Sequence, residues 1–336
     1  MELSIIKYLT VRRVWNLLLA GISYLIATAT KKPFVLGKPV FLFIEPTNRC
    51  NFQCPECPSG LGALTRPLGD MTPELFKKII DDIKTYALYV QIYLQGEPYL
   101  NKDLHEMISY ARAAGLYVVV STNGSVVTHK TVSKLLQNPP DQLIFSMDGI
   151  TEETYREYRV GGTFKAADEG LRLLMSKRKE LNKSLPKVKL QFIVMKQNEH
   201  QIGQVKVYGK TLGVDQVAFK SMQVNSVEGA KHFLPDNPKY RRYKVGTGTL
   251  EVDGELRNSC INLWHTAVVT WDGNIVPCCF DKDANFKLGT LNGKGIAEHW
   301  NSGDYNAFRQ KVLDNRKGIN MCTNCTEGLK SKYFKV

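Results

Sequence analysis

Three cysteines at short spacings, Cys50, Cys54 and Cys57, constrain this chain more than any other feature. Closely spaced thiolates usually hold iron–sulfur clusters, whose sites normally take four cysteines, so a trio leaves one iron open to a small molecule. Zinc also binds three cysteines, but the loop contains no histidine to complete a closed tetrahedral site. The spacing alone therefore favours an iron–sulfur site over a zinc site, and zinc stays open.

The other five of the eight cysteines lie after residue 259. Bunched thiols in a long chain indicate ligands kept reduced in the cytosol rather than disulfides. Cys260 and Cys278 stand 18 residues apart, and Cys322 and Cys325 form a C-x2-C pair. If either Cys278 or its neighbour Cys279 is counted, four thiols are present, which is enough for one fully coordinated cluster. A zinc ribbon is less favoured, because zinc modules normally present two tight pairs.

The chain has 336 residues, which suggests about two domains and a core that needs no disulfides. Its formal net charge of +13 favours anionic partners such as nucleic acid, phosphorylated substrates or an acidic membrane surface. The positive residues are spread without a dense run, so nucleic acid is not an expected partner. A zinc-stabilised nucleic-acid-binding protein is the alternative from another functional class.

Residues 1–38 are predicted to form a basic amphipathic helix, with an apolar stretch over residues 14–29. The stretch is short and contains polar residues, whereas a membrane-spanning helix needs about 20 apolar residues. Two interpretations stay open: the helix lies on a membrane interface, or it packs on the floor of the following domain. The expected location is cytoplasmic, at the inner face of the membrane under the first interpretation.

From residue 39 onward, short β-rich runs alternate with helix-length segments, which is typical of βαβ units with parallel strands. The predicted strands are residues 40–45, 89–94, 117–121, 142–146, 188–194 and 216–220, and helices are predicted to begin near residues 72, 102, 128, 164 and 199. Six βα units predict an α/β fold, a partial (β/α)6 barrel that resembles an incomplete TIM barrel. The predicted domains are the barrel over 39–222, a linker over 223–259 and a cysteine module over 260–336.

Small polar residues follow four of the predicted strands, at residues 45–47, 95–98, 121–124 and 146–149. In parallel α/β architectures, ligands bind at the carboxyl ends of the strands. This rim is therefore the expected active face.

The C-x3-C-x2-C after the first strand, the Gly96-Glu97-Pro98 after the second and the six βα units together resemble the radical S-adenosylmethionine (radical SAM) superfamily. The resemblance implies a 4Fe-4S cluster on Cys50, Cys54 and Cys57, whose open iron is chelated by S-adenosylmethionine. It also implies reductive cleavage of S-adenosylmethionine to a 5′-deoxyadenosyl radical, which abstracts a substrate hydrogen atom.

By the same resemblance, Gly96 and Glu97 match the motif that contacts the methionine amino group. Ser146 matches a polar position used for the ribose or carboxylate, Asn123 is a candidate of the same kind, and Arg159 is a candidate partner of the methionine carboxylate. The chain departs from the family pattern at Gln95, where glycine is commoner, and at Glu56, where many members place an aromatic residue against adenine. The adenine contact is therefore unassigned.

The C-terminal cysteines and the turn at Asp272-Gly273 resemble the SPASM extension of radical SAM enzymes. This resemblance implies one auxiliary 4Fe-4S cluster on Cys260, Cys278, Cys322 and Cys325, with Cys279 as the spare thiol. The turn itself reads as a hairpin between residues 268–269 and 275–276. A cluster without an open iron is suited to electron transfer, with a one-electron donor such as flavodoxin or ferredoxin as the expected partner.

The predicted function is a radical SAM/SPASM oxidoreductase that dehydrogenates or otherwise modifies a small or membrane-associated metabolite, such as a sugar or a lipid-linked intermediate. The alternative is a peptide or protein maturase. The sequence does not identify the acid–base residue.

Overall fold

The computed structural model describes residues 3–244 and 248–329 of the chain. These residues fall into two compact units. The first unit holds residues 3–49, 64–119 and 256–328, and the second holds residues 50–63, 120–244, 248–255 and 329. The predicted domain boundaries at 38, 222 and 259 stay a prediction beside this division.

The first unit contains the N-terminal helices, the first strands and the C-terminal cysteine module. Its helical elements are η1 (Leu3–Tyr8), α1 (Val11–Thr30), α2 (Pro73–Ile83), η2 (Pro98–Leu100), α3 (Leu104–Ala113), α9 (Asn262–His265), α10 (Ile296–Trp300), α11 (Gly303–Asn315), η5 (Arg316–Gly318) and α12 (Asn320–Thr323). Its strands are β1 (Phe41–Ile44), β2 (Tyr89–Gln91), the first half of β3 (Tyr117–Thr122), β7 (Thr266–Val269), β8 (Asn274–Val276) and β9 (Gly289–Thr290).

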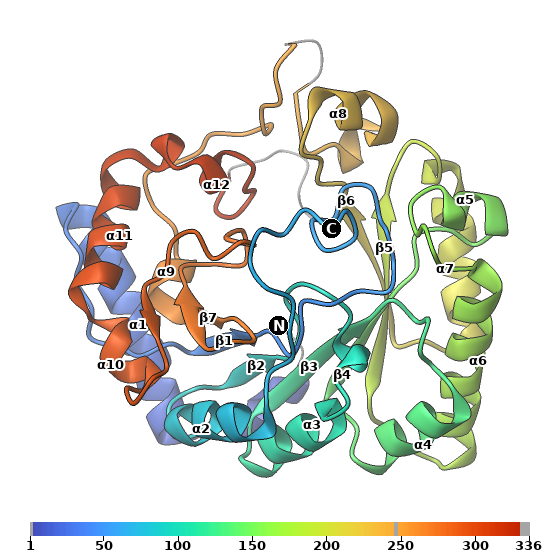
Figure 1. Cartoon of the computed structure of the whole chain (residues 1–336), viewed down its shortest axis with the longest axis horizontal. Coiled ribbons are helices and arrows are strands. Elements are labelled where there is room, and N and C mark those ends of the chain that lie inside the picture. The colour runs from blue at the N-terminus through green and yellow to red at the C-terminus, as the bar shows by residue number, and fades with distance from the viewer. Residues whose placement is uncertain (1–2, 245–247, 330–336) are drawn as a thin grey trace. The chain divides into compact units, whose positions relative to one another are not determined.

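Strand β1 lies between β2 and β7 and pairs in parallel with both. The cysteine module therefore adds β7 to the same sheet that carries the first strand (Figure 1). The predicted hairpin is confirmed, because β7 turns at Gly273 and returns as antiparallel β8, with Val269 opposite Ile275. Gly273 has a φ of 81°, a left-handed conformation that glycine adopts without steric cost.

The second unit contains the other parallel strands. Its strands are the second half of β3, β4 (Gln142–Ser146), β5 (Lys187–Val194) and β6 (Gln216–Ser221), and its helical elements are α4 (His129–Gln137), α5 (Glu152–Arg156), α6 (Phe164–Glu180), η3 (Glu199–Gln201), α7 (Ile202–Leu212), α8 (Val227–Phe233) and η4 (Pro238–Tyr240). Strand β5 lies between β4 and β6 and is parallel to both. The α/β class predicted from the sequence is confirmed, and each of the six predicted strands is present as β1 to β6.

Helix starts follow the capping pattern of the sequence. The hydroxyl groups of Thr72, Thr128 and Thr163 accept hydrogen bonds from the first turns of α2, α4 and α6. A threonine in this position satisfies a backbone N–H that the helix itself leaves unpaired. The segment predicted as a linker, residues 223–259, contains α8, η4 and a bridge between Tyr243 and Val252.

Candidate metal centre

The loop that carries Cys50, Cys54 and Cys57 is fixed by its backbone in the second unit. The Gln53 N–H donates to the Val160 carbonyl at 2.8 Å, and the Cys57 N–H donates to the Cys54 carbonyl at 3.1 Å. These hydrogen bonds fold the cysteine segment into a compact loop. The positions of the three thiols therefore depend both on bonds within the loop and on Val160, which is distant in the sequence.

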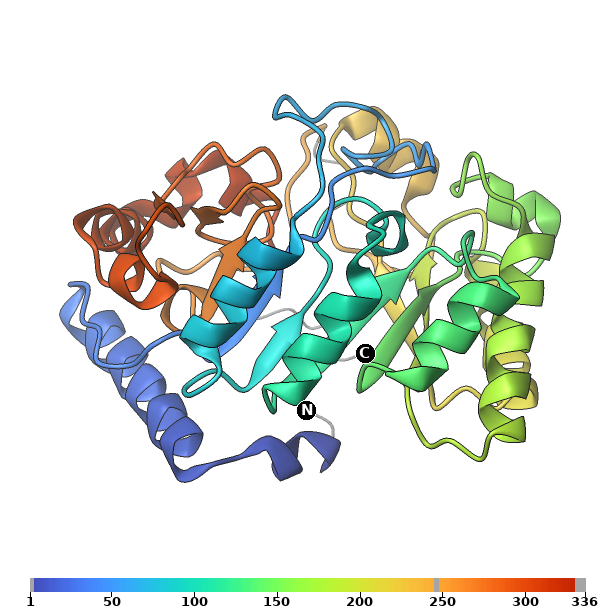
Figure 2. The same cartoon turned by 60° about the horizontal axis from the view of Figure 1, so that its bottom comes forward.

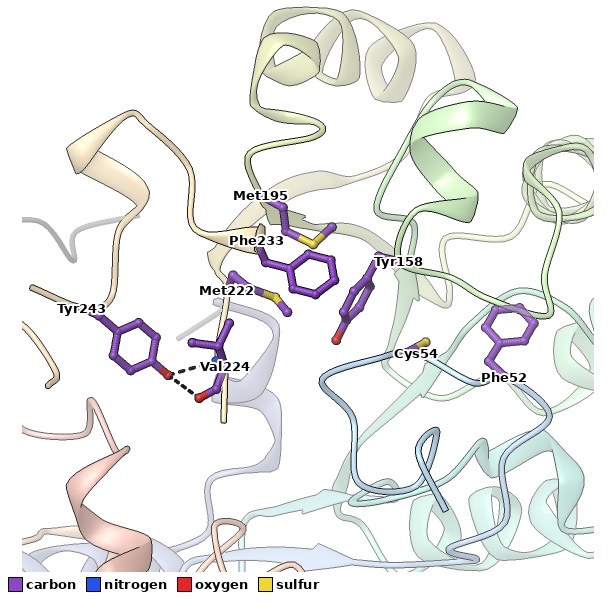
Figure 3. Packing of buried hydrophobic residues seen from close by; sticks show 8 residues of the cluster. All are labelled: Phe52, Cys54, Tyr158, Met195, Met222, Val224, Phe233 and Tyr243. Carbon is purple, nitrogen blue, oxygen red and sulfur yellow. Dashed lines mark hydrogen bonds between the residues drawn. The ribbon is translucent and has the colours of Figure 1, made fainter. Parts of the chain in front are cut away.

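The middle cysteine belongs to an apolar cluster (Figure 3). Cys54 is 5% exposed, and Cys50 and Cys57 pack against the same cluster. Its buried members are Phe52, Cys54, Tyr158, Met195, Met222, Val224, Phe233 and Tyr243. The cluster excludes water from one side of the cysteine loop, and a dry surrounding strengthens every electrostatic interaction made there.

Arg159 is a positive charge close to this loop, and its side chain is 12% exposed. Its Nε and Nη2 atoms both lie 2.6 Å from Oδ2 of Asp148, and the Asp148 side chain is fully buried. The other oxygen of Asp148 accepts the Ile193 N–H at 2.7 Å. Burial raises the pKa of Cys54 to about 12, and the Arg159 guanidinium opposes that rise. The buried thiol is therefore neutral in the free chain, and a bound metal would displace its proton.

Glu56, where the sequence departs from the family pattern, anchors the loop to the start of α8. Its carboxylate accepts the backbone N–H of Asn225 at 2.8 Å and the Asn225 side-chain amide at 3.1 Å. Gly229 of α8 is needed for this approach, because a Cβ built there would lie 2.0 Å from Glu56 Oε1. The residue at this position therefore has a loop-anchoring role, and the adenine contact is still unassigned.

Gly96 and Glu97 lie in the first unit, beside the residue that precedes Cys50. The Glu97 N–H donates to the Arg49 carbonyl at 2.8 Å. Gly96 has a φ of 73°, and a Cβ built there would lie 2.5 Å from the same carbonyl oxygen. The Glu97 carboxylate is 2% exposed and accepts the Tyr99 N–H at 3.2 Å. The structure thus places this motif against Arg49, and its predicted contact with S-adenosylmethionine stays a prediction.

Asn123 also serves the cysteine loop. Its amide donates to Asn51 Oδ1 at 3.0 Å, and its Oδ1 accepts from the Ser125 hydroxyl at 2.6 Å. Ser146 ends β4 opposite Gln191 of β5 and is 7% exposed. Both residues lie at carboxyl ends of strands in the second unit, and their predicted contacts with S-adenosylmethionine stay predictions.

The C-terminal cysteines gather in the first unit around Arg316. This arginine is 1% exposed, and its Nη2 atom lies 3.6 Å from the sulfur of Cys325. Its guanidinium is held in place by the carbonyl oxygens of Ser259, at 2.8 Å, and Glu327, at 3.0 Å. Burial lowers the pKa of Arg316, and its thiol neighbours Cys260 and Cys325 raise it, with a net rise.

The structure distinguishes the two adjacent cysteines by their neighbours. Cys278 interacts with Cys279, Cys260 and Cys325, whereas Cys279 interacts with Cys325 and is also influenced by Lys282. Burial raises the pKa of Cys279 to about 11 and that of Cys278 well above its ordinary value. The assignment of Cys278 as the fourth thiol of the C-terminal set stays a prediction.

Each of the two donor sets consists only of thiols and has an arginine nearby. Such sets fit anionic iron–sulfur clusters better than any harder metal, because soft thiolates are the usual ligands of these clusters. In the described part of the chain, no group of three or more His, Cys, Asp or Glu side chains converges on a point suited to a single metal ion.

Sequence reasoning missed the partners of these thiols. Asp148 lies two residues after the end of β4 and precedes Arg159 by 11 residues, so a carboxylate near a strand end was the available signal for that ion pair. Tyr158, Met195 and Arg316 gave no such signal, because only the folded chain brings them beside cysteines.

Family comparisons match both cysteine regions. The profile described as "Radical SAM superfamily" matches residues 44–205, and the profile described as "Iron-sulfur cluster-binding domain", SPASM, matches residues 260–326. A tungsten-containing aldehyde ferredoxin oxidoreductase cofactor-modifying protein of Pyrococcus furiosus is 26% identical, over 85% of this chain and 87% of its own length. The mycofactocin maturase MftC of Mycolicibacterium smegmatis is 28% identical over 53% of this chain and 45% of its own length. An Fe-coproporphyrin III synthase of Methanosarcina barkeri is 32% identical over 49% of this chain and 39% of its own length.

Solved structures share the fold. SuiB of Streptococcus suis bound to S-adenosylmethionine superimposes with a TM-score of 0.64 at 16% identity, covering 87% of this chain and 73% of that one. BtrN in complex with AdoMet and 2-DOIA superimposes with a TM-score of 0.53 at 19% identity, covering 86% and 94%. These likenesses confirm the predicted α/β partial-barrel class.

Proposed function

We propose that this chain, which belongs to the radical SAM superfamily and carries a C-terminal SPASM domain, is an oxidoreductase that removes hydrogen from a C–H bond of a small anionic or membrane-associated metabolite. Its cofactors are S-adenosylmethionine and 4Fe-4S clusters. The observation that carries the proposal is the Cys50–Cys57 loop, where three thiols lie against an apolar cluster and near the ion pair of Arg159 with Asp148.

Each part of the site has a separate task in this proposal. Cys50, Cys54 and Cys57 hold the first cluster, which together with S-adenosylmethionine supplies radical chemistry when bound. Glu97 provides a carboxylate for the methionine ammonium group, and Gly96 allows the backbone to approach closely. Arg159 is paired with Asp148, and its guanidinium lowers the pKa of Cys54 against the effect of burial.

The C-terminal module gives the proposed reaction its oxidative direction. Removing one hydrogen atom leaves a carbon radical, so a dehydrogenation must pass one more electron to an acceptor and release a proton. Cys260, Cys278, Cys322 and Cys325 would hold an auxiliary cluster with no open iron, which suits it to accept that electron. Arg316 favours this role, because a buried positive charge stabilises a centre that gains negative charge.

A basic cavity in the second unit supports a small anionic substrate. It has a volume of about 300 Å³, at the lower end of the range for small-molecule pockets. Four cations and one carboxylate line it together with an apolar wall: Lys196, Val227, Ala230, Lys231, Leu234, Pro235, Asp236, Arg241, Lys244, Gly248, Thr249 and Leu250. Ala230, Leu234 and Leu250 also pack against the apolar cluster that contains Cys54.

Relatives provide support for two substrate classes. The P. furiosus relative that spans most of this chain is named a cofactor-modifying protein, which favours a small molecule. The maturase name of MftC and the structure of SuiB bound to the precursor peptide SuiA favour the alternative, a peptide substrate. A metabolite is preferred here because the cavity is small and basic.

Anaerobic reconstitution tests the reaction class. We expect two iron–sulfur clusters, or roughly eight iron atoms per chain, and reductant-dependent release of 5′-deoxyadenosine. The triple variant C50A/C54A/C57A should lose about half of the iron and all of the nucleoside product, whereas C279A, which removes the spare thiol, should keep both. Nucleoside release by the triple variant at the wild-type rate would contradict the assignment.

The substrate class is tested with metabolite extracts and peptide libraries separated by anion exchange. We expect an anionic metabolite to lose two hydrogens in a reaction that requires S-adenosylmethionine. K196Q/K231Q, at the cavity, should raise the KM for that metabolite, and K206Q/K210Q, on α7, is the matched control with the same charge change. A mass loss of two hydrogens or a crosslink in a peptide, with no metabolite consumed, identifies the maturase alternative.

A further inference from the structure

The surface of α1 is inverted relative to an ordinary amphipathic helix. Its buried side consists of small and polar residues: Arg13, Asn16, Ala20, Ser23 and Ala27. Its exposed side carries large apolar residues, with Val11 88%, Trp15 61%, Leu18 52%, Ile22 45% and Leu25 66% exposed. These five residues recur at intervals of three or four, so they form one continuous apolar stripe along the helix.

The polar side of α1 is committed to the first unit. Arg13 donates to the carbonyl oxygens of Gly115 and Lys84 at 2.5 and 2.6 Å. Asn16 donates to the Tyr86 carbonyl at 3.2 Å, and the Ser23 hydroxyl accepts the Leu36 N–H at 2.8 Å. Satisfied buried polar groups are costly to separate, so these contacts fix which side of the helix faces outward.

Figure 2 shows α1, in blue, at the outer margin of the ribbon of its unit. Tyr24 packs edge-on against Trp264 of α9 with ring centroids 5.7 Å apart, and a Cβ at Gly37 would lie 2.7 Å from the Ala20 backbone nitrogen. The helix is therefore docked closely on its inner side, while its apolar stripe faces outward.

The charged residues that α1 and its flanking segments carry have one sign. Residues 3–44 contain six lysines and arginines and no aspartate or glutamate. Arg12 lies within the exposed surface of α1, and Lys31 and Lys32 lie exposed at its end. An apolar stripe flanked by cations complements an anionic bilayer, with apolar side chains among the acyl chains and cations at the headgroups. Trp15 suits the boundary between them, where tryptophan is enriched.

We propose that the exposed face of α1 docks the chain in the plane of a membrane surface that contains anionic lipid. The helix lies on the bilayer and does not cross it, because its opposite side is bonded to the first unit. In agreement, no helix in the described residues is long and apolar enough to span a membrane. This proposal does not depend on the reaction that the chain catalyses.

Vesicle binding by the reconstituted full chain tests the proposal. We expect sedimentation with phosphatidylcholine–phosphatidylglycerol vesicles, weaker sedimentation with phosphatidylcholine alone, and a blue shift of fluorescence that W15F abolishes. L18E/L25E should lower the binding constant by about tenfold or more, a change of at least ~1.4 kcal/mol. V207E/L181E is the matched control, because Val207 and Leu181 are 65% and 51% exposed, with the same charge change away from α1.

Binding that both double variants reduce equally, or that is absent from anionic vesicles, overturns the proposal. A dimer in lipid-free buffer that L18E/L25E converts to a monomer, without any vesicle binding by the wild type, assigns the face to a second copy of the chain and also overturns it. Iron content and 5′-deoxyadenosine release are measured on each variant, so a loss of vesicle binding is separated from a failure of the proposed reaction.

Discussion

Arg316 should set the reduction potential of the auxiliary cluster, and R316Q removes its charge while keeping a hydrogen-bonding amide. The guanidinium Nη2 lies 3.6 Å from the Cys325 sulfur. At an effective dielectric constant of about 20, a unit charge at this distance interacts with about 5 kcal/mol, and with ~3 kcal/mol at the ~6 Å expected for an electron shared over the whole cluster. Since 1.4 kcal/mol corresponds to about 59 mV for one electron, the potential should fall by ~100 to ~200 mV.

The assay is a redox titration of the reconstituted protein, followed by electron paramagnetic resonance. R316K is the matched control, because it keeps the positive charge and loses the planar fork that grips the Ser259 and Glu327 carbonyls. We expect R316K to shift the potential much less than R316Q, with iron content unchanged in both. An R316Q potential equal to or above that of the wild type, at full iron content, would refute the electrostatic reasoning.

Three further predictions follow from the first unit. Arg66 and Glu45 form a bidentate pair at 2.6 Å, with side chains that are 8% and 0% exposed. R66M should lower the free energy of unfolding by about 3–5 kcal/mol, because it leaves a buried carboxylate without its partner. E45Q/R66M, which also removes that charge, should have a higher melting temperature than R66M, and a double variant that melts no higher contradicts this. Burial lowers the pKa of His265 from 6.5 to about 4, so the folded protein loses stability as the pH falls through this window and the unfolded chain takes up the proton first. Between pH 7 and pH 5, the free energy of unfolding of the wild type, measured with denaturant, should fall by about 2 kcal/mol more than that of H265Q. Equal decreases in the two proteins refute this prediction. Gly96→Ala places a Cβ 2.5 Å from the Arg49 carbonyl oxygen, at a residue with a positive φ. The affinity for S-adenosylmethionine, measured by equilibrium dialysis, should therefore fall about tenfold or more, while the iron content is retained. An unchanged affinity excludes this motif from binding S-adenosylmethionine.

The sequence predicted those parts of the fold that depend on local patterns. Alternation of β-rich and helical runs predicted the six strands, and for residues 142–146 the bounds agree exactly with β4. The hairpin at Gly273 was predictable because the turn needs a left-handed residue at a known place. These features depend on neighbours within a few positions, so the sequence carries them directly.

The environment of the thiols was not predictable in the same way. The contact of Glu56 with Asn225 joins residues that are 169 positions apart. Arg316 is held beside the cysteines by hydrogen bonds to backbone carbonyl oxygens, such as that of Ser259. A carbonyl oxygen exists at every residue, so no side-chain pattern indicates which one an arginine will find. The orientation of α1 was also not predictable from local patterns. Amphipathicity alone predicts that the apolar side of the helix is buried, whereas the contacts of Arg13 and Asn16 turn that side outward.

Arg159 and Arg316 also differ in a way that bears on the direction of electron flow. Arg159 is neutralised by Asp148 at 2.6 Å, so the pair adds little net charge beside Cys54. Arg316 is held by carbonyl oxygens and forms no ion pair among the described residues, so its full positive charge acts on the auxiliary cluster. The negative charge of Glu327 acts in the opposite sense, but that side chain is exposed, and water and salt screen it. Reduction adds negative charge, so the auxiliary cluster should have the higher potential of the two and should accept electrons from the substrate radical. If titration places the auxiliary cluster below the first cluster, electron transfer in that direction is unfavourable, and a redox-neutral modification would fit this chain better than a dehydrogenation.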